Sequence, residues 1–497
     1  MRWPDPIRRG LLPGALAGLI GGLLSGATLS QVGALPATAS LVHSDSAAVD
    51  FVLYISIAAV LGGIFGVLVW YQRSGAGDVL FWGLTYGALW WFLGPLTLQP
   101  LLQGGFLAWD VHSAQEAFAS LLAHLIYGAS TGLALAAIRH WLRISPGTDT
   151  TSVASQGTGV RGAVLRGALA GLISAWLLGR MLNSQNQLLA ISVMVTGVPS
   201  GRLAWLITFG IGLVTGTTFA LLYQRPREGT GPGLIRGTVY GFFVWVVGPL
   251  TVLPLAGRGG LTWSLEAARA AFTTLPGYLL FGAAVAVIYQ WLDGLVRLLF
   301  SDLRRSHDEE GAGTEGLLAV GRGALAGLVG GLLFTVVMVR IGQLPVIAGL
   351  IGSTSLLSGL IVQFLVAEFV GISYGLLFRR QSFDIGSGLG WGISYGFFWW
   401  ILGPLTLSPL LVGASPQWKV EVAGGLFPTL IGHLAYGAGL GTVFHLLEAR
   451  QNPWWIPRTR AEAARVSRRR EQLLTSAPAV WTLVVVIALT LPVILGL

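Results

Sequence analysis

The sequence predicts an all-α polytopic membrane protein made of three parallel four-helix repeats, with 12 transmembrane helices, plus one C-terminal transmembrane helix. Composition is the first observation behind this prediction. Hydrophobic residues make up 54% of the 497 residues and charged residues 10%, whereas a soluble domain typically carries about 25% charged residues. The second observation is a series of apolar stretches of about 20 residues, the length that spans a bilayer as a helix. The third is a motif that occurs three times.

The repeated motif starts with Tyr-Gly and contains Gly-Pro-Leu-Thr. It reads YGALWWFLGPLTLQP over residues 86–100, YGFFVWVVGPLTVLP over 240–254 and YGFFWWILGPLTLSP over 395–409. Self-similarity at a fixed period indicates one structural unit used several times. The spacing of 154 and then 155 residues is too long for a solenoid repeat and suits a small domain, so we infer a triplication.

The apolar stretches divide the chain into units. We assign repeats to residues 1–144, 161–300 and 316–448, a basic cytoplasmic linker to 449–475 and a C-terminal helix to 476–497. The predicted spans are 11–31, 48–71, 79–98, 115–141, 164–184, 203–224, 234–254, 268–292, 320–340, 356–378, 387–408, 424–447 and 478–497. Because each repeat has an even number of spans, successive repeats are parallel. They either close around a pseudo-threefold axis or line up.

The distribution of cations predicts the orientation. Of the 30 Lys and Arg residues, the side opposite the N-terminus keeps only Arg180, Arg202, Arg258, Arg269, Arg340 and Lys419. Cytoplasmic loops of membrane proteins are enriched in Lys and Arg. We therefore expect a bacterial inner-membrane protein with a cytoplasmic N-terminus and an outside C-terminus. The same rule explains the net charge of +9, so nucleic acid is not expected as a partner.

The sequence lacks the residues that several classes of chemistry require. The chain has no cysteine, which excludes disulfides, iron–sulfur clusters, thiolate metal sites and cysteine nucleophiles. We find no Walker motif, catalytic triad, zinc-binding spacing or paired carboxylates. The sequence therefore predicts that the protein is not an enzyme, with no catalytic residue and no metal ligand set.

The Gly-Pro-Leu-Thr element predicts that the third helix of each repeat kinks or breaks near its outer end. A proline removes one helical hydrogen bond and displaces the preceding turn, and carbonyls freed in lipid need other partners. One hypothesis places a ligand or ion path at these breaks. The alternative, which we favour, is a helix end that is capped within its own unit by the threonine. The residues concerned are Pro95, Thr97, Pro249, Thr251, Pro404 and Thr406.

Aromatic residues precede each of these prolines and are further candidates for a ligand path: Tyr86, Trp91, Tyr240, Trp245, Tyr395 and Trp400. Buried tyrosine and tryptophan need hydrogen-bond partners. We favour packing between units as their role, with binding of an aromatic or cationic guest as the alternative. The loop that follows repeats Trp109, Trp263 and Trp418 and predicts a short amphipathic segment at the outer interface.

Ionisable groups inside the predicted spans are functional candidates by default. His124, Tyr278 and His433 occupy one equivalent position in the fourth helices. If that position faces a common axis, the three side chains converge and could ligate haem iron or relay protons; otherwise each histidine needs only one hydrogen bond within the bundle. Glu368, alone in the second helix of the third repeat, is the candidate for a coupling proton site or for a buried hydrogen bond.

Three functions remain open. The leading hypothesis is a secondary carrier or channel for a small uncharged or amphiphilic solute or a lipid. The first alternative is a non-catalytic scaffold or accessory subunit of a larger membrane complex. The second is a haem- or metal-binding membrane protein, although no resident cofactor is expected. The expected partners are the bilayer, a small-molecule or lipid substrate and other membrane proteins. A water-accessible path lined by the threonines or Glu368 would favour the carrier, and a dry interior the scaffold.

Overall fold

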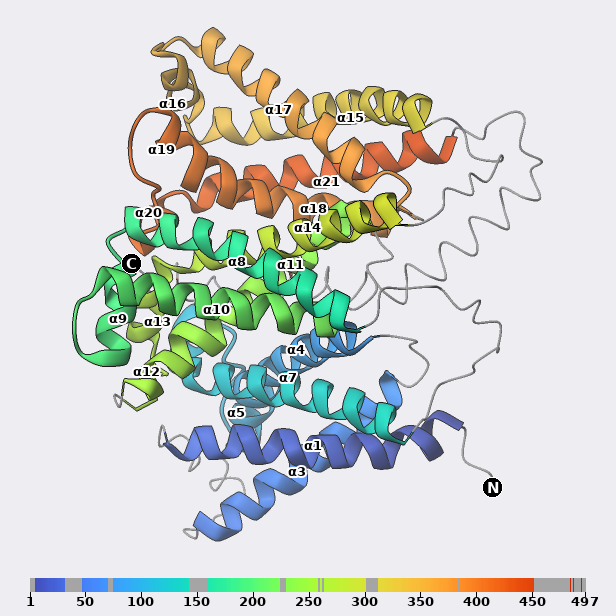
Figure 1. The fold of residues 1–497 in the computed structure, drawn as a ribbon, viewed down its shortest axis with the longest axis vertical. Coiled ribbons are helices and arrows are strands. Elements are labelled where there is room, and N and C mark those ends of the chain that lie inside the picture. The colour runs from blue at the N-terminus through green and yellow to red at the C-terminus, as the bar shows by residue number, and fades with distance from the viewer. Residues whose placement is uncertain are drawn as a thin grey trace.

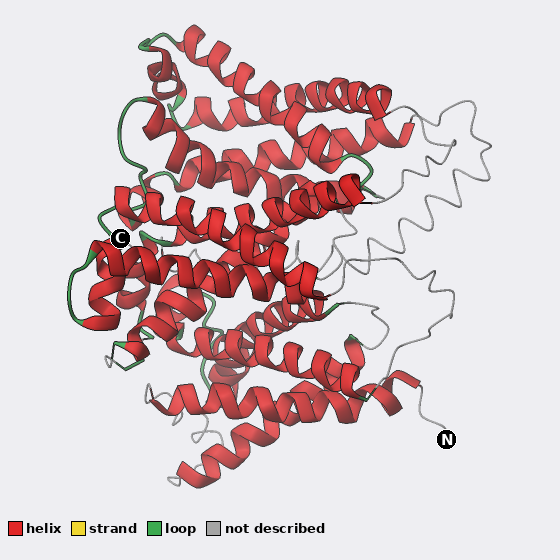
Figure 2. Ribbon diagram, in the orientation of Figure 1, coloured by secondary structure: helices red, strands yellow, loops and turns green. Residues whose placement is uncertain are grey.

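The computed structural model describes residues 5–31, 47–69, 75–142, 160–223, 229–257, 260–261, 263–300, 312–382 and 384–450, with Leu483, Val486 and Val493. This part of the chain consists of helices joined by loops and turns and contains no strand (Figure 2). Within this part of the chain, 11 helices are long and apolar enough to cross a membrane. The protein is therefore a multi-pass membrane protein of the all-α class.

The long helices form three groups of four. Group 1 contains α1 (Asp5–Gln31), α3 (Ala47–Leu68), α4 (Ala76–Leu93) and α7 (Phe118–Trp141). Group 2 contains α8 (Val160–Ser184), α10 (Gly201–Leu222), α11 (Thr230–Val247) and α14 (Leu275–Phe300). Group 3 contains α15 (Ala312–Arg340), α17 (Leu356–Phe378), α18 (Ile385–Leu402) and α21 (Phe427–Arg450). In each group the first helix packs against the second and fourth, and the third packs against the fourth.

The groups follow one another along the longest axis of the molecule. Figure 1 shows α1 and α3 of group 1 at one end, group 2 in the middle and α15 and α17 of group 3 at the other end. Group 2 contacts both neighbours, through α10 on α4 and through α11 on α17 and α18. The sequence left open whether the repeats close around a pseudo-threefold axis or line up, and the groups of helices lie in a line.

The number of spans differs in one place from the 12 expected in the repeats. Helix α18 is not among the 11 candidates, because glycine, serine and tryptophan dilute its aliphatic residues, although it is as long as α4 and α11. The expected thirteenth span and the linker at 449–475 lie almost entirely outside the described residues. The count of 13 therefore stays a prediction.

Short helices occupy the connections, and they shift the predicted boundaries. Helices α6 (Val111–Glu116), α13 (Leu265–Phe272) and α20 (Val420–Gly425) precede the fourth helices, so these begin three to seven residues later than expected. The expected amphipathic segments after the loop tryptophans are thus present as separate helices. Helices α9 (Leu188–Thr196) and α16 (Leu344–Ala348), with the 3₁₀ turn η3 (Gly349–Ile351), lie between first and second helices and were not predicted.

Glycine pairs allow the helices to cross at close range. Between third and fourth helices, a methyl group added to either glycine would lie 2.0–2.3 Å from the carbonyl oxygen of the other, in the pairs Gly83–Gly128, Gly237–Gly282 and Gly392–Gly437. First and second helices also cross at close range: in the pairs Gly18–Gly62, Gly171–Gly216 and Gly327–Gly371, a methyl group added to either glycine would lie 2.4–3.1 Å from the Cα atom of the other. Such close backbone approach is typical of packed membrane helices.

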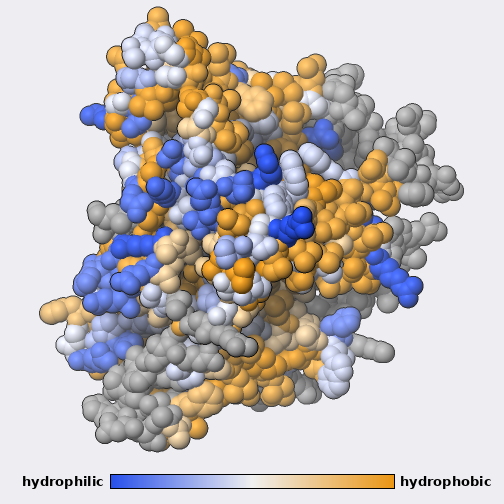
Figure 3. Space-filling model, turned by 60° about the vertical axis from the view of Figure 1, so that its left-hand side comes forward, coloured by the Kyte–Doolittle hydropathy of each residue, from blue (hydrophilic) through white to orange (hydrophobic). Residues whose placement is uncertain are grey.

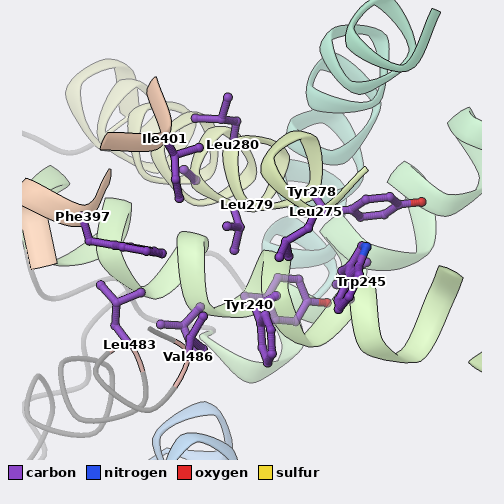
Figure 4. Close-up of a cluster of buried hydrophobic side chains, with 14 of the residues drawn as sticks. Tyr240, Trp245, Leu275, Tyr278, Leu279, Leu280, Phe397, Ile401, Leu483 and Val486 are labelled. Atoms are coloured by element: carbon purple, nitrogen blue, oxygen red, sulfur yellow. The ribbon is translucent and has the colours of Figure 1, made fainter. Parts of the chain in front are cut away.

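Apolar side chains fill the space between the groups and also cover much of the outside. Tyr240 and Leu279 of group 2 lie in one buried cluster with Phe397 of group 3, and Leu483 and Val486 pack into it (Figure 4). On the surface, wide apolar areas are interrupted by hydrophilic patches (Figure 3). An apolar exterior over apolar contacts between helices is the arrangement that lipid as a solvent requires.

Candidate functional site: the interrupted third helices

Each third helix changes its winding at the Gly-Pro-Leu-Thr element. Helices α4, α11 and α18 continue into one π-helical turn, η1 (Gly94–Leu98), η2 (Gly248–Val252) and η4 (Gly403–Leu407), and then into the short helices α5 (Gln99–Leu102), α12 (Leu253–Ala256) and α19 (Ser408–Leu411). In the first of these turns the N–H of Gln99 donates to the carbonyl of Gly94, five residues back. The wider turn accommodates the proline ring, which lacks an N–H and would crowd an α-helical turn. The expected interruption is therefore present in all three places.

The threonine of each element adds a hydrogen bond to the turn before the proline. The hydroxyls of Thr97, Thr251 and Thr406 donate to the carbonyls of Phe92, Val246 and Ile401, five residues back, each at 2.8 Å. Pro95, Pro249 and Pro404 free the carbonyls four residues back, at Trp91, Trp245 and Trp400, and the threonines bond the carbonyls next to these. That the threonines satisfy the freed carbonyls themselves stays a prediction.

The loop tryptophans complete the same sites. The indole N–H of Trp109 donates to the Thr97 hydroxyl at 3.0 Å, and that of Trp418 donates to Thr406 at 3.0 Å. In group 2 the indole of Trp263 bypasses the threonine and donates to the carbonyl of Leu250 at 3.1 Å. Each interruption is thus tied to the loop that follows it within the same group.

The other aromatic candidates also form hydrogen bonds within their own groups. Trp91, Trp245 and Trp400 donate to the turn before the fourth helix, at Ala117 (3.1 Å), Thr274 (3.0 Å) and Thr429 (3.1 Å). Tyr86, Tyr240 and Tyr395 reach the second helix, at Leu61 (2.7 Å), Thr215 (2.9 Å) and Ser373 (2.7 Å). The sequence predicted that these side chains pack between units. Their polar atoms instead form hydrogen bonds within their own group, so that prediction covers only part of their role.

His124, Tyr278 and His433, which would converge only if their position faced a common axis, are not joined. The Nδ1 atoms of His124 and His433 lie 2.7 and 2.8 Å from the carbonyls of Ser120 and Thr429, one turn back in the same helix. Since a carbonyl can only accept, Nδ1 carries the proton in both rings. The His433 ring stands edge-on to Phe334 of α15, in its own group, with centroids 5.0 Å apart.

This geometry does not fit a haem or metal site. Tyr278 is fully buried and its nearest ring partner is Phe281, on its own helix. Among the described residues, no three His, Cys, Asp or Glu side chains lie close enough together to hold a metal ion. Within the described part of the chain, no hydrogen bond or ring contact joins any two of His124, Tyr278 and His433 either, so axial ligation of one iron has no support in the geometry.

Glu368 lies where an exposed face of α17 meets α21. Its neighbours Leu365 and Phe369 are about two-thirds exposed, at 66% and 64%, while the carbonyl of Ala367 accepts a hydrogen bond from the Tyr436 hydroxyl at 2.6 Å. One carboxyl oxygen of Glu368, Oε1, is buried without a hydrogen-bond partner within the described structure. Buried unsatisfied polar atoms are uncommon, so this residue remains a candidate.

Charged pairs buried at the helix ends were missed by the sequence reasoning. Arg166 of α8 lies 3.1 Å from Asp293 of α14, and Arg236 of α11 lies 3.6 Å from Asp78 of α4. The second pair joins group 2 to group 1. Its signal in the sequence was Arg236 itself, which stands where the other two repeats carry Trp82 and Trp391.

The cavity between groups 1 and 2 is small and apolar. It encloses about 20 Å³ between α7, α11 and α14 and is lined by side chains such as Leu122, Trp245, Phe272 and Val493. A cavity of that size holds about one water at most, and water also needs polar partners. The residues proposed for a ligand path do not line it, apart from Trp245.

Comparison with known proteins gave no relative: no family model, no curated protein and no solved structure matches this chain.

The double role of Thr406 leads to a prediction. Thr406→Val should destabilise the protein by about 2 kcal/mol or more, because it leaves both the Ile401 carbonyl and the Trp418 indole unpaired in a buried site. Thr251→Val is the matched control, since Trp263 does not depend on Thr251, and it should cost about half as much. Unfolding by SDS in mixed micelles measures both. Equal losses would show that the Trp418 bond adds nothing.

Proposed function

We propose that this protein is a non-catalytic membrane scaffold or accessory subunit, built from three copies of one four-helix unit. The observation that carries the proposal is that the hydrogen bonds at each interrupted helix are formed within its own group. At every π turn a threonine hydroxyl bonds a carbonyl at the end of the preceding helix, and a tryptophan of the following loop donates a hydrogen bond back to the same element. A solute path through these points would need polar atoms left over for the solute.

The repetition of contacts supports the three-copy architecture. In each group, helices cross at equivalent glycines, and the equivalent tyrosine of the third helix forms a hydrogen bond to the second helix. The cation count supports an inner-membrane location with the N-terminus in the cytoplasm. The hydrogen bond from Arg269 of α13 to the carbonyl of Val493 supports an outside C-terminus, because α13 belongs to the connections on that side.

A secondary carrier is the second candidate, and two observations favour it. The buried Glu368 oxygen lacks a partner among the described residues, and a protonatable carboxyl inside a membrane is a standard component of proton-coupled carriers. The glycines Gly94 and Gly248 at two π turns also have no atom within 4 Å of an added methyl group. A small solute could approach the backbone there.

Purification from native membranes in a mild detergent separates the two candidates. A scaffold should co-purify with other membrane proteins in fixed ratio, identified by mass spectrometry after chemical cross-linking in the intact membrane. A carrier should instead be recovered alone and, in proteoliposomes, should move protons when a transported solute is added. Recovery without stable protein partners would contradict the scaffold.

Glu368→Gln tests the carrier directly. The scaffold predicts that a pH-sensitive dye inside proteoliposomes reports the same slow proton leak for the wild-type protein, for Glu368→Gln and for empty vesicles, across a panel of uncharged solutes. The carrier predicts a solute-dependent signal for the wild-type protein that the variant loses. Such a loss would overturn the scaffold proposal.

A further inference from the structure

One contact recurs at both boundaries between neighbouring groups. At the first boundary, a methyl group added to Gly77 of α4 would lie 2.2 Å from the ring of Tyr223, at the end of α10. At the second, one added to Gly231 of α11 would lie 2.5 Å from the carbonyl of Leu377 and 3.0 Å from the ring of Phe378, at the end of α17. In both, the start of a third helix packs on the end of the next group's second helix.

The residues in these two contacts are equivalent by the repeat spacing. Gly77 and Gly231 are 154 residues apart, and Tyr223 and Phe378 are 155 apart. The contact is heterologous, since a third-helix face on one group meets a second-helix face on the next. Repeated contacts of this kind continue until something stops them or they close.

Both faces recur at the ends of the molecule, where they are uncovered. On α18 of group 3, the equivalent glycine is Gly386, which is exposed, and a methyl group there would meet only Asp384 of its own turn. Next to it, Ile385 is 54% exposed. The corresponding glycines Gly77 and Gly231 are both buried.

On group 1, Val69 stands at the position of Tyr223 and Phe378 and is buried in its own group, with 3% of its surface exposed. The complementary face is open beside it, at Leu68. Leu68 at the end of α3 is 63% exposed, whereas its equivalents Leu222 and Leu377 pack against the core at the two internal contacts. Groups 1 and 3 lie at opposite ends of the molecule (Figure 1). The two open faces therefore do not meet within one chain.

We propose that the open face at Ile385 and Gly386 of one chain binds the open face at Leu68 of a second copy, so that the protein assembles head to tail in the membrane. This inference rests on the three-copy architecture proposed above. It commits to a second copy because the chain itself carries the complementary face, already formed twice between its own groups. Lipid covering both faces is the competing outcome.

Cysteine cross-linking tests the contact cleanly, since the chain has no cysteine of its own. Leu68→Cys and Ile385→Cys variants with different tags are co-expressed and oxidised in the membrane. We expect a disulfide-linked species that carries both tags and forms in the mixture only. The absence of that species, or a link within one chain that carries both substitutions, would overturn the proposal.

An internal pair shows which assumption has failed. Thr230→Cys with Leu377→Cys places cysteines at the equivalent positions of the second internal contact and should form a link within one chain. If that link forms and the Leu68–Ile385 link does not, only the assembly is wrong. If neither forms, the arrangement of the groups is wrong as well.

A blocking variant gives a second readout without cysteine. Gly386→Trp has room within its own chain, so it should fold, but it should occupy the face that receives the second copy. We expect the mass of the detergent-solubilised protein, measured by light scattering, to fall from at least two chains to one. Gly210→Trp on α10, where an added methyl group has no atom within 4 Å, is the control and should keep the larger mass. A monomeric wild-type protein would overturn the proposal.

Discussion

Gly237→Leu should prevent most of the protein from reaching its folded state. A methyl group at this position in α11 would already lie 2.3 Å from the carbonyl oxygen of Gly282, and the next contacts are backbone or Ala286. Backbone atoms cannot rotate away, so α11 and α14 would have to separate along their whole length. Overpacking in a close-packed interior costs about 1–3 kcal/mol and occasionally more. We expect about 3 kcal/mol or more, since rigid helices transmit the displacement.

The measurement is the free energy of unfolding in mixed micelles, together with the yield of monodisperse protein. Gly210→Leu is the matched control: it makes the same change inside α10, where an added methyl group has no atom within 4 Å, and leucine has a better helix propensity than glycine. The control should be neutral or slightly stabilising. If both variants lost a similar free energy of unfolding, the close crossing of α11 and α14 would not be the reason for glycine at position 237.

Arg236→Ala should produce the second large loss. Arg236 and Asp78 pair at 3.6 Å with side chains only 8% exposed, and the guanidinium also lies over the Tyr223 ring, 5.4 Å from its centroid. Removing one partner leaves a buried charge uncompensated, which costs about 3–5 kcal/mol. Because the pair joins groups 1 and 2, that boundary should open first, as increased hydrogen exchange in α4 and α11.

The chain supplies its own control for this prediction. At the equivalent boundary between groups 2 and 3, the positions of Asp78 and Arg236 are taken by Pro232 and Trp391, and Trp391 packs on Phe378 at 5.5 Å between centroids. The double replacement Asp78→Pro with Arg236→Trp should therefore recover most of the lost stability, since well-packed apolar residues can replace a buried ion pair. A double variant as unstable as Arg236→Ala would show that the ion pair is needed for more than compensation of charge.

Local chemistry explains which parts of the site could be predicted. The interruption of the third helices follows from proline alone, and the bond of Thr97 to Phe92 lies within one turn, so both were accessible from the sequence. The link from Trp109 to Thr97 spans 12 residues and depends on how the loop folds back. It could be suspected only because the tryptophan recurs in each repeat.

The histidines show where this reasoning ends. Equivalent positions in three repeats suggested that His124, Tyr278 and His433 share an axis. That inference needed the rotation of each fourth helix about its own axis. In the structure the His433 ring lies against Phe334 of its own group, and its Nδ1 forms a hydrogen bond with a backbone carbonyl of its own helix.

The sequence by itself determined the class of protein, the positions of most membrane helices and the places where three of them are interrupted. These follow from composition, length and the missing N–H of proline, which act within one or two helical turns. Only the tertiary structure decided which faces meet: the Asp78–Arg236 pair, the Gly77–Tyr223 contact and the open surfaces at Leu68 and Gly386. The physical reason is that lipid and helix interiors are equally apolar, so hydropathy does not distinguish a face that packs on another helix from one that faces the bilayer.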